Sequence, residues 1–68
     1  MAEGRLYFRV IERADNAWTC RRGRDDIDQH SSRQEAVDHM TILAAQHRPS
    51  EVLVHCRNGE VESAAKLT

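Results

Sequence analysis

Histidine and cysteine are the residue types of this chain best suited to metal binding or catalysis, and the segment EVLVHCRNGEVES places His55 and Cys56 side by side. Consecutive side chains on a β-strand point to opposite faces, so this pair cannot bind one ion together. Zinc sites usually contain close ligand pairs such as C-x₂₋₄-C or H-x₃₋₅-H, and the chain has no such pair. His39 and His47 are too far apart on one helix to share an ion. We therefore predict no metal site and no cofactor.

Neither the cysteines nor the acidic run DDID has the pattern of a catalytic site. A catalytic cysteine must be exposed beside a base, whereas residue alternation predicts that Cys20 and Cys56 both face the core. Asp25, Asp26 and Asp28 directly follow the basic run RRGR, so local charge pairing accounts for them. The glycines are scattered and form no phosphate-binding loop. We predict that the protein is not an enzyme and has no catalytic residue.

Arginine dominates the basic residues and could create a nucleic-acid surface. In two predicted strands arginines alternate onto one polar face, with Tyr7 and Thr19 beside them. Such a face can follow phosphates and stack a base. The candidate contacts are Arg9, Arg13, Arg21, Arg22 and Arg24. The net charge of −1 gives no overall attraction for nucleic acid, so a solvated face whose arginines neutralise nearby acids is the competing interpretation.

The length of 68 residues allows a single domain, residues 1–68, with loose ends expected at 1–5 and 64–68. A chain this short buries only about 60% of its unfolded surface, so its core is thin and a partner chain would extend it. No segment is long and apolar enough for an export signal or a membrane span. We expect a cytoplasmic protein with reduced thiols and no membrane contact.

Two segments of alternating polarity near the amino terminus, LYFRVIER and WTCRR, predict a β-hairpin. A three-residue loop, Asp15 to Ala17, pairs Glu12 with Cys20 and places Asn16 or Ala17 in the left-handed conformation. The even-numbered residues then share one apolar face, which consists of Phe8, Val10, Trp18 and Cys20. The segment DIDQH could add a short third strand.

The segment SRQEAVDHMTILAAQH predicts the one helix. Ser32 and Glu35 have the spacing of a capping box, in which each side chain satisfies the other residue's backbone N–H, and Pro49 ends the helix. The apolar stripe consists of Ala36, Val37, Met40, Leu43, Ala44 and His47. Ile42 lies off this stripe, where a second chain could pack, and is therefore the predicted dimer contact.

The dipeptide Asn58-Gly59 predicts a second hairpin, because both residues tolerate the positive φ angles of a type I′ turn. A two-residue loop pairs Cys56 with Val61 and turns both toward the core. The apolar face of this hairpin then consists of Val52, Val54, Cys56 and Val61.

Three segments together resemble a known family. They are NAW at 16–18, SRQEA at 32–36 and EVLVHCRNGEV at 51–61. Their order is similar to that of the small bacterial proteins catalogued as domain of unknown function 2188, over nearly the whole chain. The resemblance implies the fold and brings no activity, substrate or cofactor with it. Cys56 stands where this family usually has glycine, and Ala17 where it often has glycine before the tryptophan.

These patterns predict an α+β fold, an antiparallel sheet of four to five strands with one helix in the order β-β-(β)-α-β-β. The expected core is Phe8, Val10, Trp18, Cys20, Val37, Met40, Leu43, Val54, Cys56 and Val61. The leading interpretation of function is a non-catalytic, homodimeric protein-interaction module, and the link HRPSE would permit a domain swap of the last hairpin. The alternative is a nucleic-acid-binding module that uses the arginine-rich sheet face.

Overall fold

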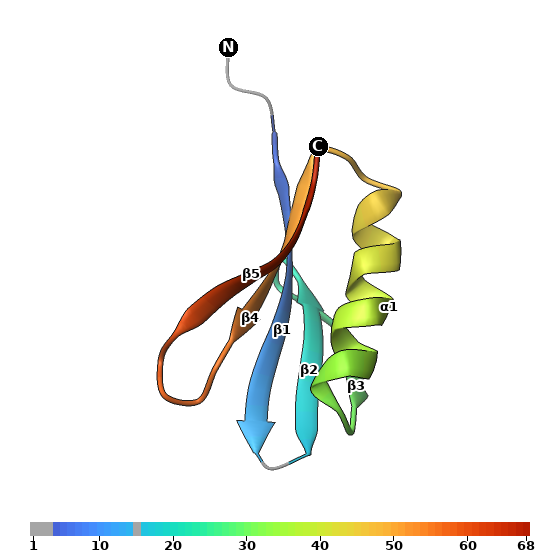
Figure 1. Ribbon diagram of the computed structural model, residues 1–68. Helices are drawn as coiled ribbons and strands as arrows, with labels where there is room; N and C mark the ends of the chain where they lie inside the picture. Colours follow the sequence, from blue (N-terminus) through green and yellow to red (C-terminus); the bar gives the residue numbers. More distant parts are fainter. Residues whose placement is uncertain (1–3, 15) are drawn as a thin grey trace.

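Five β-strands and one α-helix are present in a computed structural model that describes residues 4–14 and 16–68. They are β1 (Leu6–Ala14), β2 (Ala17–Arg22), β3 (Asp25–His30), α1 (Arg33–Ala45), β4 (Ser50–His55) and β5 (Val61–Leu67). The helix lies along one side of the sheet (Figure 1). The predicted α+β class and element order are confirmed, and DIDQH forms the third strand. Predictions that concern residues 1–3 and Asp15 lie outside the described residues.

The central pair of strands is parallel, which makes the sheet mixed. The strand order is β3-β2-β1-β4-β5, and β1 runs parallel to β4 while all other neighbours are antiparallel. The sequence predicted only antiparallel pairing, because each hairpin taken alone is antiparallel. Parallel neighbours need a crossover of about a dozen or more residues, and the segment through α1 provides it. This crossover lays α1 on the sheet and sets the two hairpins side by side.

The first hairpin has the predicted faces but a different register. Glu12 lies opposite Trp18 instead of Cys20, a shift of two residues along β2. Because side chains alternate with a period of two, this shift leaves every residue on its predicted face. Phe8 and Cys20 are accordingly buried in the core. Asn16 has a φ of 59°, in the left-handed region predicted for this turn.

The second hairpin differs from its prediction by one residue, which reverses the faces of the beginning of β5. His55, rather than Cys56, lies opposite Val61. The N–H of Gly59 donates to the carbonyl of Cys56 over 3.0 Å, and Gly59, but not Asn58, has a positive φ, of 94°. The loop is therefore a four-residue turn that ends in a glycine bulge, not a type I′ turn. Val61 is 53% exposed, and its predicted place in the core is wrong.

A second irregularity lets β5 continue to Leu67. Between the residues that pair with Val52 and Leu53 of β4, β5 contains one extra residue, Ala64. This bulge returns Ala65 and Leu67 to the core side, where both are partly buried. The carboxyl-terminal segment, which was expected to be loose, thus belongs to the sheet up to Leu67.

The helix begins at its predicted cap, where Ser32 Oγ accepts a hydrogen bond from the N–H of Glu35 over 3.1 Å. Its buried stripe meets the sheet in a core of Phe8, Val10, Cys20, Ala36, Met40, Ala44, Val52 and Val54. Four other predicted core residues are partly buried against it, namely Trp18, Val37, Leu43 and Cys56. His47 lies beyond the helix end and stacks on Phe8, with 6.0 Å between ring centroids. Within the described residues α1 is the one helix, and it is too short to cross a membrane.

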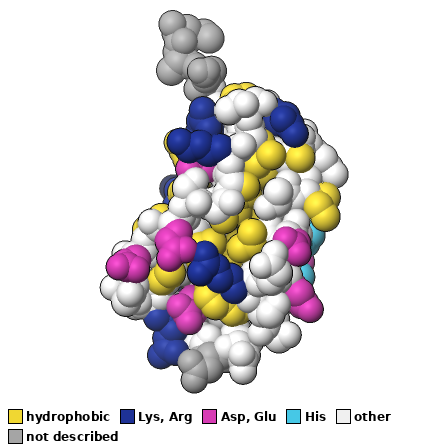
Figure 2. All heavy atoms as spheres, viewed as in Figure 1, with side chains coloured by type: hydrophobic (Ala, Val, Ile, Leu, Met, Phe, Trp, Pro, Cys, Tyr) yellow, Lys and Arg dark blue, Asp and Glu magenta, His cyan; other side chains and the backbone are white. Residues whose placement is uncertain are grey.

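The hydrophobic core is less completely buried near β5 than elsewhere. On the side viewed in Figures 1 and 2, hydrophobic side chains form a band between α1 and β5, with acidic and basic side chains around it. Ala65 and Leu67 of β5 pack against the core but stay partly exposed. This side of the molecule therefore keeps apolar surface in contact with water.

Candidate functional site

The face of the sheet opposite α1, which we call the open face, carries three of the five predicted arginines. Arg9 and Arg21 lie opposite each other on β1 and β2. Arg13 follows on β1, and its Nε donates a hydrogen bond to Thr19 Oγ1 over 3.4 Å. Leu53 of β4 lies opposite Arg9 and adds apolar surface to the same face. Alternation from the buried core positions places all of these side chains away from the helix.

The other two predicted arginines do not lie on the open face. Arg22 pairs across the strands with Phe8, and its guanidinium carbon is 5.6 Å from the centroid of the Phe8 ring, so it projects to the helix side. Arg24 belongs to the turn between β2 and β3, next to Gly23, whose φ is 61°. The sequence placed Arg22 and Arg24 at the loop that follows the arginine face, and the structure has Arg22 at the end of β2 and Arg24 in the turn.

Arg22 and Arg24 instead line an open groove of about 800 Å³ at one end of the sheet, which we call the arginine groove. Its basic lining consists of Arg5, Arg9, Arg22 and Arg24. Tyr7, Phe8 and His47 contribute aromatic rings, and Asp25 is the one acidic residue among the described lining residues. Guanidinium groups around an exposed aromatic ring form a surface suited to anions with planar groups.

Arg9 joins the arginine groove to the open face through its contacts with Tyr7 and His55. Its guanidinium carbon lies 5.8 Å from the centroid of the Tyr7 ring, and its NH1 lies 2.9 Å from His55 Nε2. A guanidinium can only donate, so His55 Nε2 accepts this bond in its unprotonated form. Burial first, and then the charge of Arg9, lower the pKa of His55 below its usual 6.5. The Arg9 charge therefore has a neutral neighbour rather than an acidic one.

Ile42, the predicted dimer contact, is 61% exposed and is the most exposed large hydrophobic residue among those described. One helical turn before it, Asp38 accepts a hydrogen bond from Gln34 over 2.8 Å, so the surrounding helix surface is polar. Its exposure fits a contact with a second chain, and the dimer itself stays a prediction.

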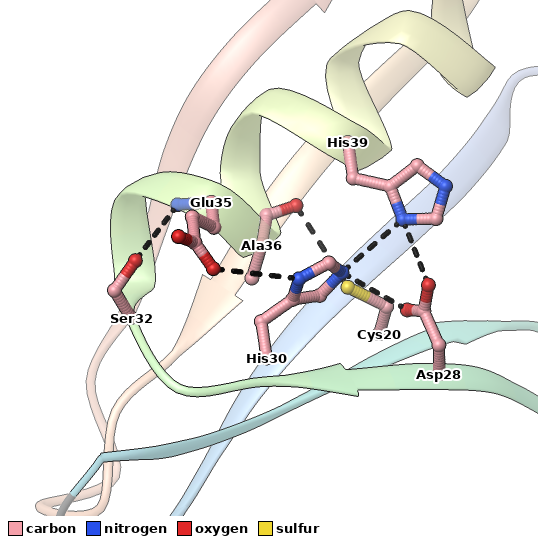
Figure 3. A network of polar contacts seen from close by, with 7 residues as sticks. All are labelled: Cys20, Asp28, His30, Ser32, Glu35, Ala36 and His39. Atoms are coloured by element: carbon pink, nitrogen blue, oxygen red, sulfur yellow. Dashed lines mark hydrogen bonds and ion pairs between the residues drawn. The ribbon is translucent and has the colours of Figure 1, made fainter.

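Four side chains that no sequence pattern grouped together converge between β2, β3 and α1 (Figure 3). Cys20 comes from β2, Asp28 and His30 from β3, and His39 from α1. Each offers a sulfur, oxygen or nitrogen atom, and these four atoms all lie within 4.8 Å of one another. We call this group the polar cluster.

A β-bulge in β3 turns Asp28 toward the polar cluster. Asp28 lies opposite Cys20 while Asp26 lies opposite Arg21, which leaves Ile27 as an extra residue. Residues two apart on a regular strand share a face, but the bulge separates these two aspartates. Asp26 reaches the open face and pairs with Arg21 at 3.4 Å, as the charge-pairing interpretation predicted. Asp28 points to the helix side instead.

The polar atoms of the cluster face one another at short distances. His39 Nδ1 lies 3.0 Å from Asp28 Oδ2 and 3.3 Å from His30 Nε2, and His30 Nε2 lies 3.3 Å from Asp28 Oδ1. A neutral imidazole carries one ring proton, so the two facing nitrogens cannot satisfy all of these contacts as donors. Asp28 Oδ1 is buried and has no hydrogen-bond partner of good geometry among the described residues.

Cys20 and Glu35 complete the surroundings of the polar cluster. The Cys20 thiol is fully buried and donates to the carbonyl of Ala36 over 3.8 Å. Burial, followed by a hydrogen bond to Asp28 and by the charge of that carboxylate, raises the pKa of Cys20 to about 12. Glu35 Oε1 lies 3.9 Å from Nδ1 of His30, the ring nitrogen that points away from the cluster. The capping box predicted that the Glu35 carboxylate would bond to the backbone N–H at the helix cap. In the structure this carboxylate lies toward His30 instead.

Sequence spacing concealed the polar cluster because its residues come from three elements. The local signal is the D-x-H pattern of Asp28 and His30, which places both side chains on one face of a strand. Cys20 and His39 join them only through strand pairing and helix packing. No spacing rule for zinc ligands covers such a combination.

The elements and surfaces together make a small α+β domain with a mixed five-stranded sheet, one helix, a cationic groove and a partly buried polar cluster. Residues 8–65 match the family described as an uncharacterized protein conserved in bacteria, DUF2188, and the chain belongs to that family. The resemblance seen in the sequence is thereby confirmed. No curated protein and no solved structure matches the chain.

Proposed function

We propose that this protein is a non-catalytic module that binds single-stranded nucleic acid through the arginine groove and the adjoining open face. One observation supports this function above others. Four arginines and Tyr7 line the groove against a single aspartate among its described lining residues, in a chain whose net charge is −1. Basic side chains are therefore concentrated at this end of the sheet, and acidic ones lie mostly elsewhere.

The chemistry of the groove suits a nucleotide chain. Guanidinium groups bind phosphate oxygens in pairs, and the Tyr7 ring, 42% exposed, can stack on a base. The groove volume of about 800 Å³ falls in the range of about 300–1,000 Å³ that is typical of ligand sites. Arg13 and Arg21 continue the basic surface along the open face, where further phosphates would lie.

A titration of the ¹⁵N–¹H correlation spectrum with a short single-stranded DNA oligonucleotide tests this function. We expect shifts at Tyr7, Arg9, Gly23 and Arg24, and a logarithmic affinity that falls with the logarithm of salt by about 0.7 for each phosphate bound. Replacing Arg24 by glutamine should weaken binding and reduce this slope by about 0.7. Arg33→Gln is the matched control, because Arg33 pairs with Glu62 on the helix side. An unmoved spectrum, or equal effects of the two variants, contradicts the function.

Homodimeric protein interaction is a second candidate function, favoured by the exposure of Ile42 and by the apolar band between α1 and β5. A small domain with a thin core gains stability when a second copy covers such surface. Exchange of the carboxyl-terminal hairpin between copies is one form of this dimer. Light scattering at high micromolar concentration should give a dimer mass for the wild type and a monomer mass for Ile42→Gln. A monomeric wild type contradicts this candidate.

For either function we propose the cytoplasm as the compartment. Cys20 and Cys56 are both free thiols, as expected in a reducing environment. Mass spectrometry after rapid alkylation of cells should find both cysteines reduced. A disulfide in the freshly alkylated protein contradicts this localisation.

A further inference from the structure

We propose that the polar cluster, Cys20, Asp28, His30 and His39, is a binding site for Zn²⁺. The site is separate from the arginine groove and does not depend on nucleic-acid binding. It would hold β2, β3 and α1 together through one ion. Sequence spacing indicated no metal site, and the inference rests on the tertiary arrangement alone.

The distances within the cluster match the edges of a tetrahedral zinc site. Zinc binds nitrogen and oxygen at about 2.0–2.1 Å, so neighbouring ligand atoms in a tetrahedron lie about 3.3 Å apart. His30 Nε2 and His39 Nδ1 lie 3.3 Å apart, and each lies close to a different oxygen of Asp28, His39 at 3.0 Å from Oδ2 and His30 at 3.3 Å from Oδ1. The Cys20 sulfur lies within 4.8 Å of these atoms, from the direction of β2. An ion at the centre would draw the Cys20 sulfur and one oxygen of Asp28 toward the two imidazole nitrogens.

The types of ligand also favour zinc over harder cations. A thiol and two imidazoles are ligands for zinc and other borderline metals, whereas calcium and magnesium prefer oxygen alone. Four protein ligands fill the coordination shell and leave no position for a substrate, so the site would be structural. The side chains of Asp28 and His39 are 36% and 34% exposed, which provides a path for the ion from solvent.

A cation also resolves the electrostatics of the cluster. Without an ion, the Asp28 carboxylate and the buried Cys20 thiol face each other, and the contact of Asp28 Oδ1 with His30 Nε2, at 3.3 Å, lacks the geometry of a hydrogen bond. Binding Zn²⁺ would displace the Cys20 proton to solvent and pair the metal with both anions. Glu35 beside His30 Nδ1 supplies the outer carboxylate that commonly orients a metal-binding histidine.

The site would mainly secure β3. This strand is at the edge of the sheet, and none of its residues is fully buried. The attachment of β3 to the domain therefore depends on its pairing with β2 and on the contacts of the polar cluster, rather than on core packing. A bound ion would join the edge strand to the helix above it.

A metal titration of protein purified with a chelator and then dialysed free of it tests the site. Co²⁺ should produce the absorption of a tetrahedral complex together with a sulfur-to-cobalt charge-transfer band, and Zn²⁺ should displace it. Loss of a residue that only orients a metal ligand usually lowers metal affinity by about 10–100-fold. His39→Gln and Asp28→Asn change a ligand itself, so each should weaken Zn²⁺ binding by at least about 100-fold. Zn²⁺ should raise the melting temperature of the wild type and not of these variants.

The chain offers a matched control for each type of ligand. His55→Gln, Cys56→Ser and Asp26→Asn alter the same residue types outside the cluster and should bind Zn²⁺ as the wild type does. Because buried Cys20→Ser could itself unfold the protein, the more exposed His39 and Asp28 decide the test. A cobalt complex without sulfur absorption, equal affinity in His39→Gln and His55→Gln, or no binding at all overturns the proposal. The oligonucleotide titration is independent of each of these outcomes.

Discussion

The polar cluster and the arginine groove are both built from charged and titratable side chains, yet they present them in opposite ways. The cluster encloses its groups between α1 and the sheet, and atoms of different character converge on one point. The groove spreads four arginines and a single aspartate around an open space at the end of the sheet. The first arrangement suits a small cation, and the second suits an extended anion.

The comparison shows that residue type alone does not indicate what a surface binds. Asp25 and Asp28 are three positions apart in one short strand, but Asp25 borders the arginines of the groove and Asp28 faces histidines and a thiol. In the cluster each side chain would be one of four ligands of the proposed Zn²⁺ ion, so a single substitution should change the metal affinity strongly. In the groove four arginines would share the attraction for nucleic-acid phosphates, so a single substitution should change the affinity for nucleic acid only slightly. Three experiments probe the residues of these two regions and of the open face.

The largest effect is expected from Phe8→Ala, because the Phe8 ring is both the centre of the core and part of the groove lining. Removal of a buried phenyl ring typically costs about 3–5 kcal/mol of unfolding free energy. Denaturation by urea measures this loss, and Tyr7→Ala, which changes an exposed ring on the other face, is the control. A loss for Phe8→Ala no greater than that for Tyr7→Ala would mean that the groove is not supported by the core.

A second effect should separate the two thiols of the metal-free protein. Cys20 is fully buried, and with a pKa of about 12 against an ordinary 9.0 its thiolate fraction is about 1,000-fold smaller. The pKa of Cys56 is also raised, by desolvation first and then by the charge of Glu62, but this thiol is not buried in the core. We expect Cys56 to react with iodoacetamide at least about 100-fold faster than Cys20. Peptide mapping over time distinguishes them, and equal rates would show that the cluster is open.

The smallest effect concerns the pH dependence of stability through His55 on the open face. Because its pKa is lowered by folding, the unfolded chain binds this proton more readily than the folded one. The contribution of His55 is therefore fully present above pH 6.5 and decreases as the pH falls through 6.5 toward the lowered value. Unfolding free energies of the wild type and His55→Gln at several pH values measure it. A variant with the same or a steeper loss toward acid would contradict the neutral partner assigned to Arg9.

The two hairpins show how far alternation of polarity predicts a fold. In the first hairpin the register error was two residues, and every face was still correct. In the second it was one residue, so Val61 went to solvent. Asn58-Gly59 is compatible with more than one turn, and the choice between them decided the face of β5.

The candidate sites were predictable to different degrees. Arg9, Arg13 and Arg21 were placed correctly on one face, because alternation within a single strand suffices for that. Arg22 and Arg24 were expected at the loop, but the direction of the Arg22 side chain depends on where β2 ends and how the chain turns around Gly23. Of the polar cluster, only the D-x-H pair of Asp28 and His30 had a local signal, since a bulge at Ile27 and the packing of α1 bring the four residues together.

Local spacing and apolar periodicity were enough to predict the elements, the capped helix, the family and most of the core. They did not predict the parallel pairing of β1 with β4, the bulges in β3 and β5, or the convergence of Cys20, Asp28, His30 and His39. The physical reason is that these features are settled by contacts between segments distant in the chain. Such contacts compete in free energy across the whole domain and leave little trace in any one segment.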